Sequence, residues 1–333
     1  MTRDTSRHKC WAPSFAVGVA CLLAPAPAAE PAAARVEVKR NAAPERLSVS
    51  IDGKEAFSFF HGPGVDLPYL VPLSPSGKEL TVVRTDPYPH HRSVWFGDTV
   101  RLAGQRRASF YNAWYSRKDK KDPNSPFMDR VRCVKIDWKQ PEGERRDDVT
   151  IDAKLLWEID GRTAVLDESR RMRFIPLSAD GREYLLDLTF TLTAAYGDVA
   201  FVSDAVHYAW PYVRMATAFS VDKGGTMTSS TGGVNQKATC DRTAWWIDYS
   251  HTVGGVTEGL ALLVHPSGGG PPRWLTRDYG TFGPRRDDAR SGKPFTLKKG
   301  DSISQRAAVL VHRGDVQAGK VAERCKAYAA AGK

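Results

Sequence analysis

Three long segments of alternating apolar residues, joined by Asp-Gly pairs, constrain the fold of this chain more than any other feature. The segments are residues 149–159, 163–175 and 184–194, with Asp160-Gly161 and Asp180-Gly181 between them. Alternation is the period of a half-buried strand, and Asp-Gly favours a tight hairpin because such a turn needs positive φ angles. The pattern predicts a three-stranded antiparallel meander.

The rest of the chain shows more strands and one helix. Further strands are predicted at residues 46–51, 56–60, 93–96, 131–138, 199–202, 205–210, 243–249, 256–265 and 301–312. Residues 316–330 carry one apolar stripe at helical spacing, and Asp315 precedes them as a natural N-cap. The order of elements contains no alternation of strand and helix. It predicts an all-β fold, a large antiparallel β-sandwich with one C-terminal helix.

The first residues are typical of a secretory signal peptide. A basic start is followed by an apolar run at 11–23 and by Ala26-Pro27-Ala28, a small-residue cleavage site. We expect a signal peptide at 1–28, a flexible Ala/Pro-rich start at 29–45 and a single domain at 46–333, in a secreted or periplasmic protein. Lipidation of Cys21 is an alternative reading of the same leader. No later apolar run is long enough for a membrane span.

Charge and cysteine content limit the partners. The formal net charge is +10, but basic and acidic residues are interspersed and no nucleic-acid motif occurs. We therefore expect no nucleic-acid partner and attribute the charge to surface composition or anionic partners. Cys133, Cys240 and Cys325 lie beyond the leader, odd in number and far apart, so no disulfide framework is predicted, although one pair could bridge.

The densest cluster of polar and ring side chains lies at residues 86–98. Two prolines stiffen this loop, and His90, His91, Arg92 and Trp95 follow them. One interpretation is a general acid/base or metal ligand, with Arg92 holding an anionic or hydroxyl-rich group. The alternative is a histidine that anchors the loop backbone. In the polar stretch that follows, residues 97–126, the exposed loop at 118–126 is either a lid over the site or an insertion without a role.

Other candidate residues lie on predicted strands and on the loops between them. Glu168 and Arg170 share one strand face, which either turns inward or forms an exposed ladder of charges. The segment 207–214 contains His207, Tyr208, Trp210 and Arg214, a composition that suits stacking on sugar rings but also an aromatic core.

Two later segments have the same ambiguity. Asp248 lies among aromatic residues that include Trp246, and a carboxylate there must be paired or functional. The segment 265–280 begins with His265 and contains the residues Trp274, Arg277 and Tyr279. Arg277 could also form a plain ion pair with its neighbour Asp278.

The sequence lacks the motifs of several common catalytic and cofactor-binding sites. The sequence contains no nucleophile elbow, P-loop, dinucleotide fingerprint or zinc motif. A metal held by His91, His207 and His265 with a carboxylate is conceivable, but no local spacing supports it. Cofactor and metal therefore stay unassigned.

A set of motifs in fixed order resembles a known family. They are residues 67–73, the Pro-His-His-Arg run at 89–92, Trp245–Tyr249 in one-letter form WWIDY, His265-Pro-Ser, and the Trp-x-x-Arg-Asp-Tyr-Gly run at 274–280. They resemble an uncharacterised bacterial domain family labelled "methane oxygenase PmoA-like". The resemblance implies a secreted β-sandwich with a mutarotase-like outline, associated with carbohydrate breakdown. Methane oxidation itself is disfavoured, because the enzyme subunit behind that label is a bundle of apolar helices.

These observations favour a secreted, carbohydrate-associated protein. The leading hypothesis is an enzyme that processes a sugar or glycoside in a cleft lined by Trp210, Trp246 and Trp274. His91 would be the acid or base, with His207 or Glu168 as its counterpart. The predicted substrate-binding residues are His90, Arg92, Trp95, Tyr208, Arg214, Trp246, Asp248, His265, Trp274, Arg277 and Tyr279. The alternatives are a non-catalytic carbohydrate-binding module and an anion-binding surface protein. The expected partner is a small molecule or an oligosaccharide.

Overall fold

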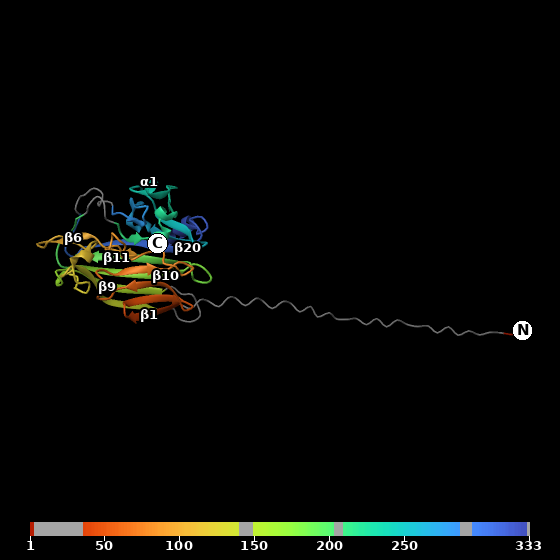
Figure 1. The fold of residues 1–333 in the computed structure, drawn as a ribbon, viewed down its shortest axis with the longest axis horizontal. Coiled ribbons are helices and arrows are strands. Elements are labelled where there is room, and N and C mark those ends of the chain that lie inside the picture. Colours follow the sequence, from red (N-terminus) through yellow and green to blue (C-terminus); the bar gives the residue numbers. More distant parts are fainter. Residues whose placement is uncertain (3–35, 140–148, 203–208, 287–294, 332–333) are drawn as a thin grey trace. The chain divides into compact units, whose positions relative to one another are not determined.

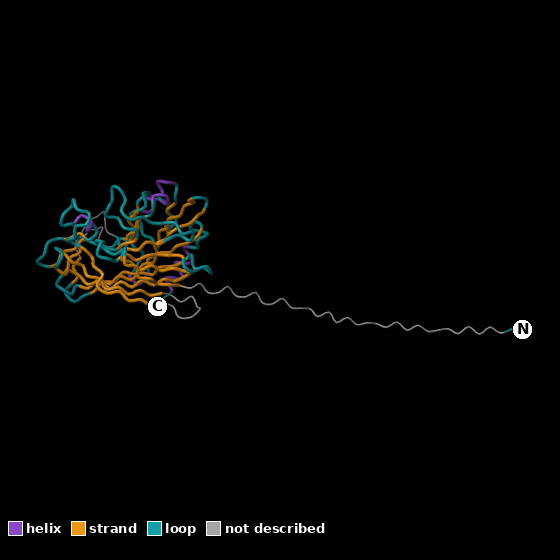
Figure 2. Tube along the Cα trace, turned by 60° about the horizontal axis from the view of Figure 1, so that its bottom comes forward, coloured by secondary structure: helices purple, strands orange, loops and turns teal. Residues whose placement is uncertain are grey.

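The structure is a computed structural model that describes residues 1–2, 36–139, 149–202, 209–286 and 295–331. The chain divides into residues 1–32 and 33–333, and the second part contains all the strands and helices described. Its described strands form two eight-stranded sheets and one four-stranded sheet. Strands and loops make up nearly all of the described trace, with few helices (Figure 2). The predicted all-β antiparallel fold is therefore confirmed.

The first sheet contains the N-terminal strands and three short strands that matter for the site. In spatial order its strands are β1 (Val36–Ala42), β2 (Glu45–Ile51), β3 (Lys54–Phe60), β4 (Tyr69–Pro72), β5 (Val94–Trp95), β13 (Tyr212–Arg214), β18 (Thr281–Pro284) and β17 (Trp274–Thr276).

The second sheet contains the long strands. In spatial order they are β14 (Thr226–Ser229), β15 (Trp246–Val253), β16 (Val256–Val264), β20 (Ser302–Arg313), β11 (Tyr184–Thr193), β10 (Thr163–Pro176), β9 (Val149–Ile159) and β8 (Arg130–Lys139). Figure 1 shows β9, β10, β11 and β20 as layered arrows in this part of the molecule.

The remaining elements are short. The four-stranded sheet has the order β19 (Phe295–Leu297), β12 (Val199–Phe201), β6 (Thr99–Leu102) and β7 (Ala108–Ser109). The described helices are α1 (Asn235–Thr239), α2 (Val321–Ala330) and the 3₁₀ turns at Ala113–Ser116, Thr217–Phe219, Val221–Lys223 and Pro266–Gly268.

The two large sheets pack face to face through apolar side chains. Phe57 of β3 lies 5.7 Å from Phe174 of β10 between ring centroids, and Phe96, just after β5, stacks on Phe190 of β11 at 4.4 Å. Inward residues alternate with outward ones along β10, as its sequence predicts. Burial of such side chains stabilises the fold by roughly 25 cal/mol for each Å² of apolar surface removed from water.

The predicted meander is present as β9, β10 and β11. The turn after β9 has Asp160 at φ +54° and Gly161 at φ +71°, the left-handed pair that a tight Asp-Gly hairpin needs. The second connection differs, because only Gly181 has a positive φ there and the chain makes a longer loop from residue 177 to residue 183.

Two sequence expectations need correction. The start predicted to be flexible, residues 29–45, contains β1, which pairs along its whole length with β2. The last helix begins at Val321 rather than at residue 316. Asp315 does accept hydrogen bonds from the backbone N–H groups of Gln317 and Ala318, at 3.0 and 2.9 Å, but it closes a turn before the helix.

Candidate functional site

Three short strands, β5, β13 and β18, connect the two regions that contain most of the candidate residues. β13 lies between the other two and pairs with each in antiparallel register. The residues before β5, after β13 and before β18 therefore meet at one end. The residues after β5, before β13 and after β18 meet at the opposite end.

The first end contains a cluster of stacked rings, which we call the ring cluster. Its members are Tyr88, His90, His91, Tyr111, Tyr115 and Tyr279. Tyr88 lies nearly parallel to His91 at 4.8 Å between centroids and to Tyr279 at 5.4 Å. The loop predicted from the two prolines thus presents its rings to a loop almost two hundred residues further along the chain.

His91 is held on both sides of its imidazole. Its Nε2 lies 3.2 Å from the Tyr111 hydroxyl, and its Nδ1 lies 3.5 Å from the Thr281 hydroxyl. Only 2% of the residue is exposed, and Tyr88 stacks on its ring. This histidine is therefore fixed in place beneath other side chains.

His90 and Tyr115 form the accessible side of the ring cluster. His90 Nδ1 lies 3.4 Å from the Tyr115 hydroxyl, and 48% of Tyr115 is exposed. The two neighbouring histidines differ in burial, although their rings meet edge to face with centroids 4.6 Å apart.

Beneath the ring cluster lies a second aromatic layer. Trp95 of β5 stacks on its cross-strand partner Tyr212 of β13 at 4.9 Å. Both are buried, and Tyr111 packs against each of them. Trp95, predicted to bind substrate, supports the ring cluster from below.

Arg214, at the end of β13, is a buried cation beside the ring cluster. Its guanidinium carbon lies 4.6 Å from the centre of the Tyr279 ring, and its Nη1 donates a hydrogen bond to the Tyr279 carbonyl. Burial lowers the pKa of Arg214. Within the described part of the chain, no carboxylate forms an ion pair with it.

A small cavity adjoins the exposed side of the ring cluster, and we call it the loop pocket. Its volume is about 220 Å³, and its lining residues are Trp114, Tyr115, Arg117, Lys120, Lys121 and Pro123. The polar stretch at residues 97–126 therefore supplies two rings of the cluster, Tyr111 and Tyr115, and the wall of a cavity. The role of its loop at 118–126 as a lid stays a prediction.

The opposite end of the short strands contains a larger cavity, which we call the arginine cavity. Its volume is about 340 Å³, and it is lined among others by Trp210, His265, Arg285, Arg286, Phe295 and Gln305. Arg286 lies 3.5 Å from the Asp98 carboxylate, which also accepts a hydrogen bond of 2.9 Å from Trp210 Nε1. Arg285 lies 3.2 Å from the carboxylate of Asp241.

Arg92 has a structural role, contrary to its predicted contact with substrate. It is fully buried, and its Nε and Nη2 donate to Asp66 Oδ1 at 3.1 and 2.6 Å. Its Nη1 donates to the carbonyls of Pro89 and His91 at 2.6 and 2.9 Å. Arg92 therefore fixes the backbone that carries the two histidines, and every one of these bonds would be lost with a shorter side chain.

Glu168 also has a structural role rather than the predicted catalytic one. The face shared with Arg170 does turn inward, and both side chains are buried. Trp157 Nε1 donates to one Glu168 oxygen at 2.8 Å, and Arg170 Nε donates to the other at 2.7 Å. Glu168 therefore bonds to side chains of β9 and β10, whereas His91 packs on Trp95 of β5 at 5.5 Å between ring centroids.

Asp248, predicted to bind substrate, forms a buried ion pair with a histidine instead. Its Oδ1 lies 2.7 Å from Nε2 of His312, a residue that the sequence did not single out, and both side chains are fully buried. Burial alone lowers the pKa of His312, but the Asp248 carboxylate outweighs it and the net pKa is raised. Gly259 and Gly319 leave room for this imidazole, since a Cβ at either would come within 2.6 Å of it. These two glycines were the signal in the sequence that could have indicated the buried His312 side chain.

The predicted tryptophans of the cleft lie apart. Trp274 is fully buried, and its Nε1 donates to the Ala244 carbonyl at 2.8 Å. Trp246 belongs to the apolar cluster that includes Val321, Cys325 and Tyr328 of α2. Trp210 lines the arginine cavity, whereas Trp246 lines a separate cavity of about 350 Å³ beside α2, so the structure does not support a cleft made by these three tryptophans.

The remaining candidates have separate environments. Arg277 donates to the Thr276 carbonyl at 2.9 Å and approaches Cys240 Sγ at 3.2 Å. Asp278 accepts instead from the Gln236 backbone N–H. His265 lines the arginine cavity, and its Nε2 lies 3.2 Å from Arg306 Nη1.

The remaining predictions concern two undescribed residues, the cysteines, metal ligands and membrane spans. His207 and Tyr208 lie outside the described residues. Cys133, Cys240 and Cys325 are all unbridged. In the described ranges, no group of three or more His, Cys, Asp or Glu side chains is placed to hold a metal ion. No helix in those same ranges has both the length and the apolar character needed to cross a membrane.

The ring cluster includes residues that sequence reasoning did not select. Tyr88, Tyr111 and Tyr115 were noted only as part of their segments, and Thr281 was not noted. The signal available for them was the occurrence of tyrosines in otherwise polar segments, Tyr88 between two prolines and Tyr111 and Tyr115 each after another aromatic residue.

A model of one protein family matches residues 46–326, which include every element of this site. This chain belongs to that family of unknown function, DUF6807. Membership of an uncharacterised domain family is thus confirmed, while the "PmoA-like" label stays a prediction. No curated protein matches the sequence significantly.

Solved structures with a similar fold include carbohydrate-active proteins. The GH36 alpha-galactosidase AgaB from Geobacillus stearothermophilus is 10% identical, with a TM-score of 0.44 over 85% of this chain and 42% of that one. A galactose 1-epimerase from Lactobacillus acidophilus is 7% identical, with a TM-score of 0.34 over 85% and 100%. The GalM/aldose epimerase homologue from C. elegans is 8% identical, with a TM-score of 0.32 over 85% and 100%.

These comparisons bear on architecture alone. The predicted mutarotase-like sandwich has aldose epimerases among its structural neighbours. The chain spans less than half of the length of the alpha-galactosidase. At such identities and TM-scores, the neighbours say nothing about the chemistry of this chain.

Proposed function

We propose that this protein is an exported carbohydrate-binding protein and that the sugar binds in the loop pocket beside the ring cluster. The observation that carries the proposal is the exposed Tyr115 ring in the wall of that cavity, next to Trp114 and within hydrogen-bonding reach of His90. Aromatic faces pack against the C–H faces of sugar rings, and polar tips meet the hydroxyls. Export is proposed from the leader at residues 1–28.

Binding fits the described geometry better than catalysis does. Glu168 bonds to Trp157 and Arg170, and His91 lies against the hydroxyls of Tyr111 and Thr281, with both side chains buried. These contacts favour structural roles for the two residues over the predicted acid/base pair. A binding module needs converging rings rather than a reactive pair, and the rings of Tyr88, His90, Tyr115 and Tyr279 do converge.

A glycoside-processing enzyme is the second candidate. The observation in its favour is the His90–Tyr115 contact of 3.4 Å, which puts an imidazole and a phenol together at an accessible edge. In this version His90 exchanges a proton with the substrate. The predicted pair of His91 and His207 stays a prediction, since residue 207 lies outside the described part of the chain.

The test is titration calorimetry of the full chain against neutral and acidic oligosaccharides. We expect Tyr115→Ala to weaken binding about tenfold, which corresponds to about 1.4 kcal/mol. The matched control is Tyr196→Ala, because Tyr196 is 45% exposed and bonds to Asp167 on β10. Binding that Tyr115→Ala leaves intact would place the sugar elsewhere. Turnover lost in His90→Ala with affinity retained would favour the enzyme.

A further inference from the structure

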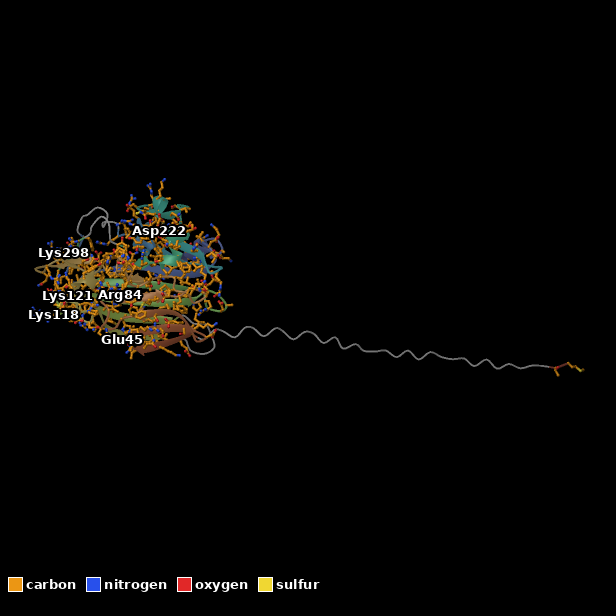
Figure 3. The ribbon with its side chains drawn as sticks, in the orientation of Figure 1. Glu45, Arg84, Lys118, Lys121, Asp222 and Lys298 are labelled. Carbon is orange, nitrogen blue, oxygen red and sulfur yellow. The ribbon has the colours of Figure 1, made fainter. Side chains whose placement is uncertain are left out.

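The loop pocket has more positive charge than its surroundings neutralise. Arg117, Lys120 and Lys121 line it, and Lys118 lies beside them in the sequence. None of the three lysines has an ion-pair partner in the described residues. Figure 3 shows Lys118 and Lys121 on the same side of the molecule as Arg84.

The nearest acidic side chains of the loop are used by its own backbone. Asp119 Oδ1 accepts a hydrogen bond of 2.9 Å from the backbone N–H of Lys121. Asp122 Oδ1 accepts one of 2.8 Å from the backbone N–H of Asn124. These bonds hold the carboxylates in local turns, so they shape the loop rather than pair with the lysine ammonium groups.

One further cation, Arg84, shares the Trp114 ring with Arg117 of the pocket lining. The guanidinium carbons of Arg84 and Arg117 lie 4.2 and 4.6 Å from its centre. Arg92 is 5.3 Å away, but Asp66 neutralises it. Burial lowers the pKa of Arg84, and the charge of Arg92 lowers it further.

We infer that the ligand of the loop pocket is an acidic oligosaccharide whose carboxylate binds to Arg117, Lys120 and Lys121. This inference rests on the proposed function and names its ligand class. The sugar ring packs on Tyr115 while the carboxylate accepts charge-assisted hydrogen bonds from the pocket wall. The combination of an aromatic wall and unneutralised cations in a cavity of about 220 Å³ suits a uronic acid better than a neutral sugar.

The probe is the linear trimer of galacturonic acid, and the control ligand is its fully methyl-esterified form, which has the same rings without the charges. Calorimetry with the full chain at low and high salt should show that the acid binds at least about tenfold more tightly than the ester and that salt weakens only the acid. Lys120→Ala combined with Lys121→Ala should lower the affinity for the acid at least about tenfold and leave that for the ester unchanged.

Lys298→Ala is the matched protein control. Lys298 is an equally exposed lysine that pairs with Asp198 at 2.8 Å, and it is labelled in Figure 3. The acid affinity of this variant should equal that of the wild type. Because all these lysines are on the surface, the thermal midpoint of each variant should match the wild type, which separates a binding defect from a folding defect.

Each contrary result has a distinct meaning. Equal affinity for acid and ester, or binding of neutral oligosaccharides alone, overturns the acidic ligand and leaves carbohydrate binding in place. Absence of binding to any oligosaccharide overturns both proposals. Lysine-dependent binding of single-stranded DNA or anionic vesicles, with no binding of the trimer, assigns the pocket to a different class of partner and overturns the inference.

Discussion

Arginines lie at both ends of β5, β13 and β18. At one end they pair with carboxylates, and at the other end they do not. In the arginine cavity, Arg285 and Arg286 face the carboxylates of Asp241 and Asp98. Beside the ring cluster, Arg214 contacts a tyrosine ring and a carbonyl and has no carboxylate partner among the described residues. The two ends therefore differ in the partners of their arginines, which are carboxylates at one end and an aromatic ring with a carbonyl at the other.

The largest expected effect is a loss of stability at the arginine cavity, where carboxylates neutralise the arginines. Asp98→Ala should lower the free energy of unfolding by about 3–5 kcal/mol, because it leaves Arg286 without this carboxylate and Trp210 without its acceptor. Urea unfolding of the full chain measures this. A loss below about 1 kcal/mol would show that the cavity does not depend on this pair.

A smaller effect is expected at the other end. Arg214→Met leaves no described carboxylate unpaired and removes only a cation–π contact and a hydrogen bond, so we expect a loss of about 1 kcal/mol. Arg286→Met is the matched variant and should cost about as much as Asp98→Ala. Equal losses for the two arginine variants, measured by the same urea unfolding, would remove the distinction between the ends.

The pH dependence of stability offers a third test, through His265 of the arginine cavity. Burial, followed by the charge of Arg306, lowers the pKa of His265 below its usual 6.5. As pH falls below about 6.5, the unfolded chain takes up this proton before the folded protein does, so the free energy of unfolding decreases.

We expect His265→Gln to flatten that part of the curve of stability against pH, measured by urea unfolding at a series of pH values. The wild-type curve is the reference, and the stability above the usual pKa is compared separately because the substitution also changes packing. An unchanged slope on the acid side would mean that His265 is protonated as easily in the folded protein as in the unfolded chain.

The smallest effect belongs to the loop pocket. Lys121→Ala should change the free energy of unfolding by less than about 0.5 kcal/mol, since the lysine is exposed and has no ion-pair partner among the described residues. Thermal unfolding without ligand checks this. Destabilisation well above that value would indicate that Lys121 supports the loop and would weaken its assignment to a ligand.

Local patterns in the sequence predicted much of the fold. The strand at Val149–Ile159 has the predicted bounds, because alternation and the following Asp-Gly turn are both properties of neighbouring residues. The helix start was placed too early because Asp315 also has the chemistry of a turn residue, and its hydrogen bonds close a turn instead. Signals between neighbouring residues therefore predict whether a segment is a strand or a helix better than they predict its first and last residues.

The candidate site was predicted only in part, because its contacts are non-local. The sequence selected His90 and His91 from their unusual loop, but nothing in that loop indicates Thr281, which lies 190 positions away. Arg92 and Asp248 were selected for their chemistry and turned out to be neutralised by Asp66 and His312. A charged residue in an apolar segment indicates that a partner is needed, but the sequence does not show which residue that partner is. A structural and a functional role therefore look alike in the sequence.

The ring cluster draws its members from three widely separated segments, residues 88–91, 111–115 and 279–281. Consequently, no fragment of the chain carries the complete arrangement. During synthesis, the arrangement cannot form until residue 281 has left the ribosome. A ligand that recognises it would thus act as a reporter of finished folding, since it would bind neither truncated chains nor intermediates that lack β18.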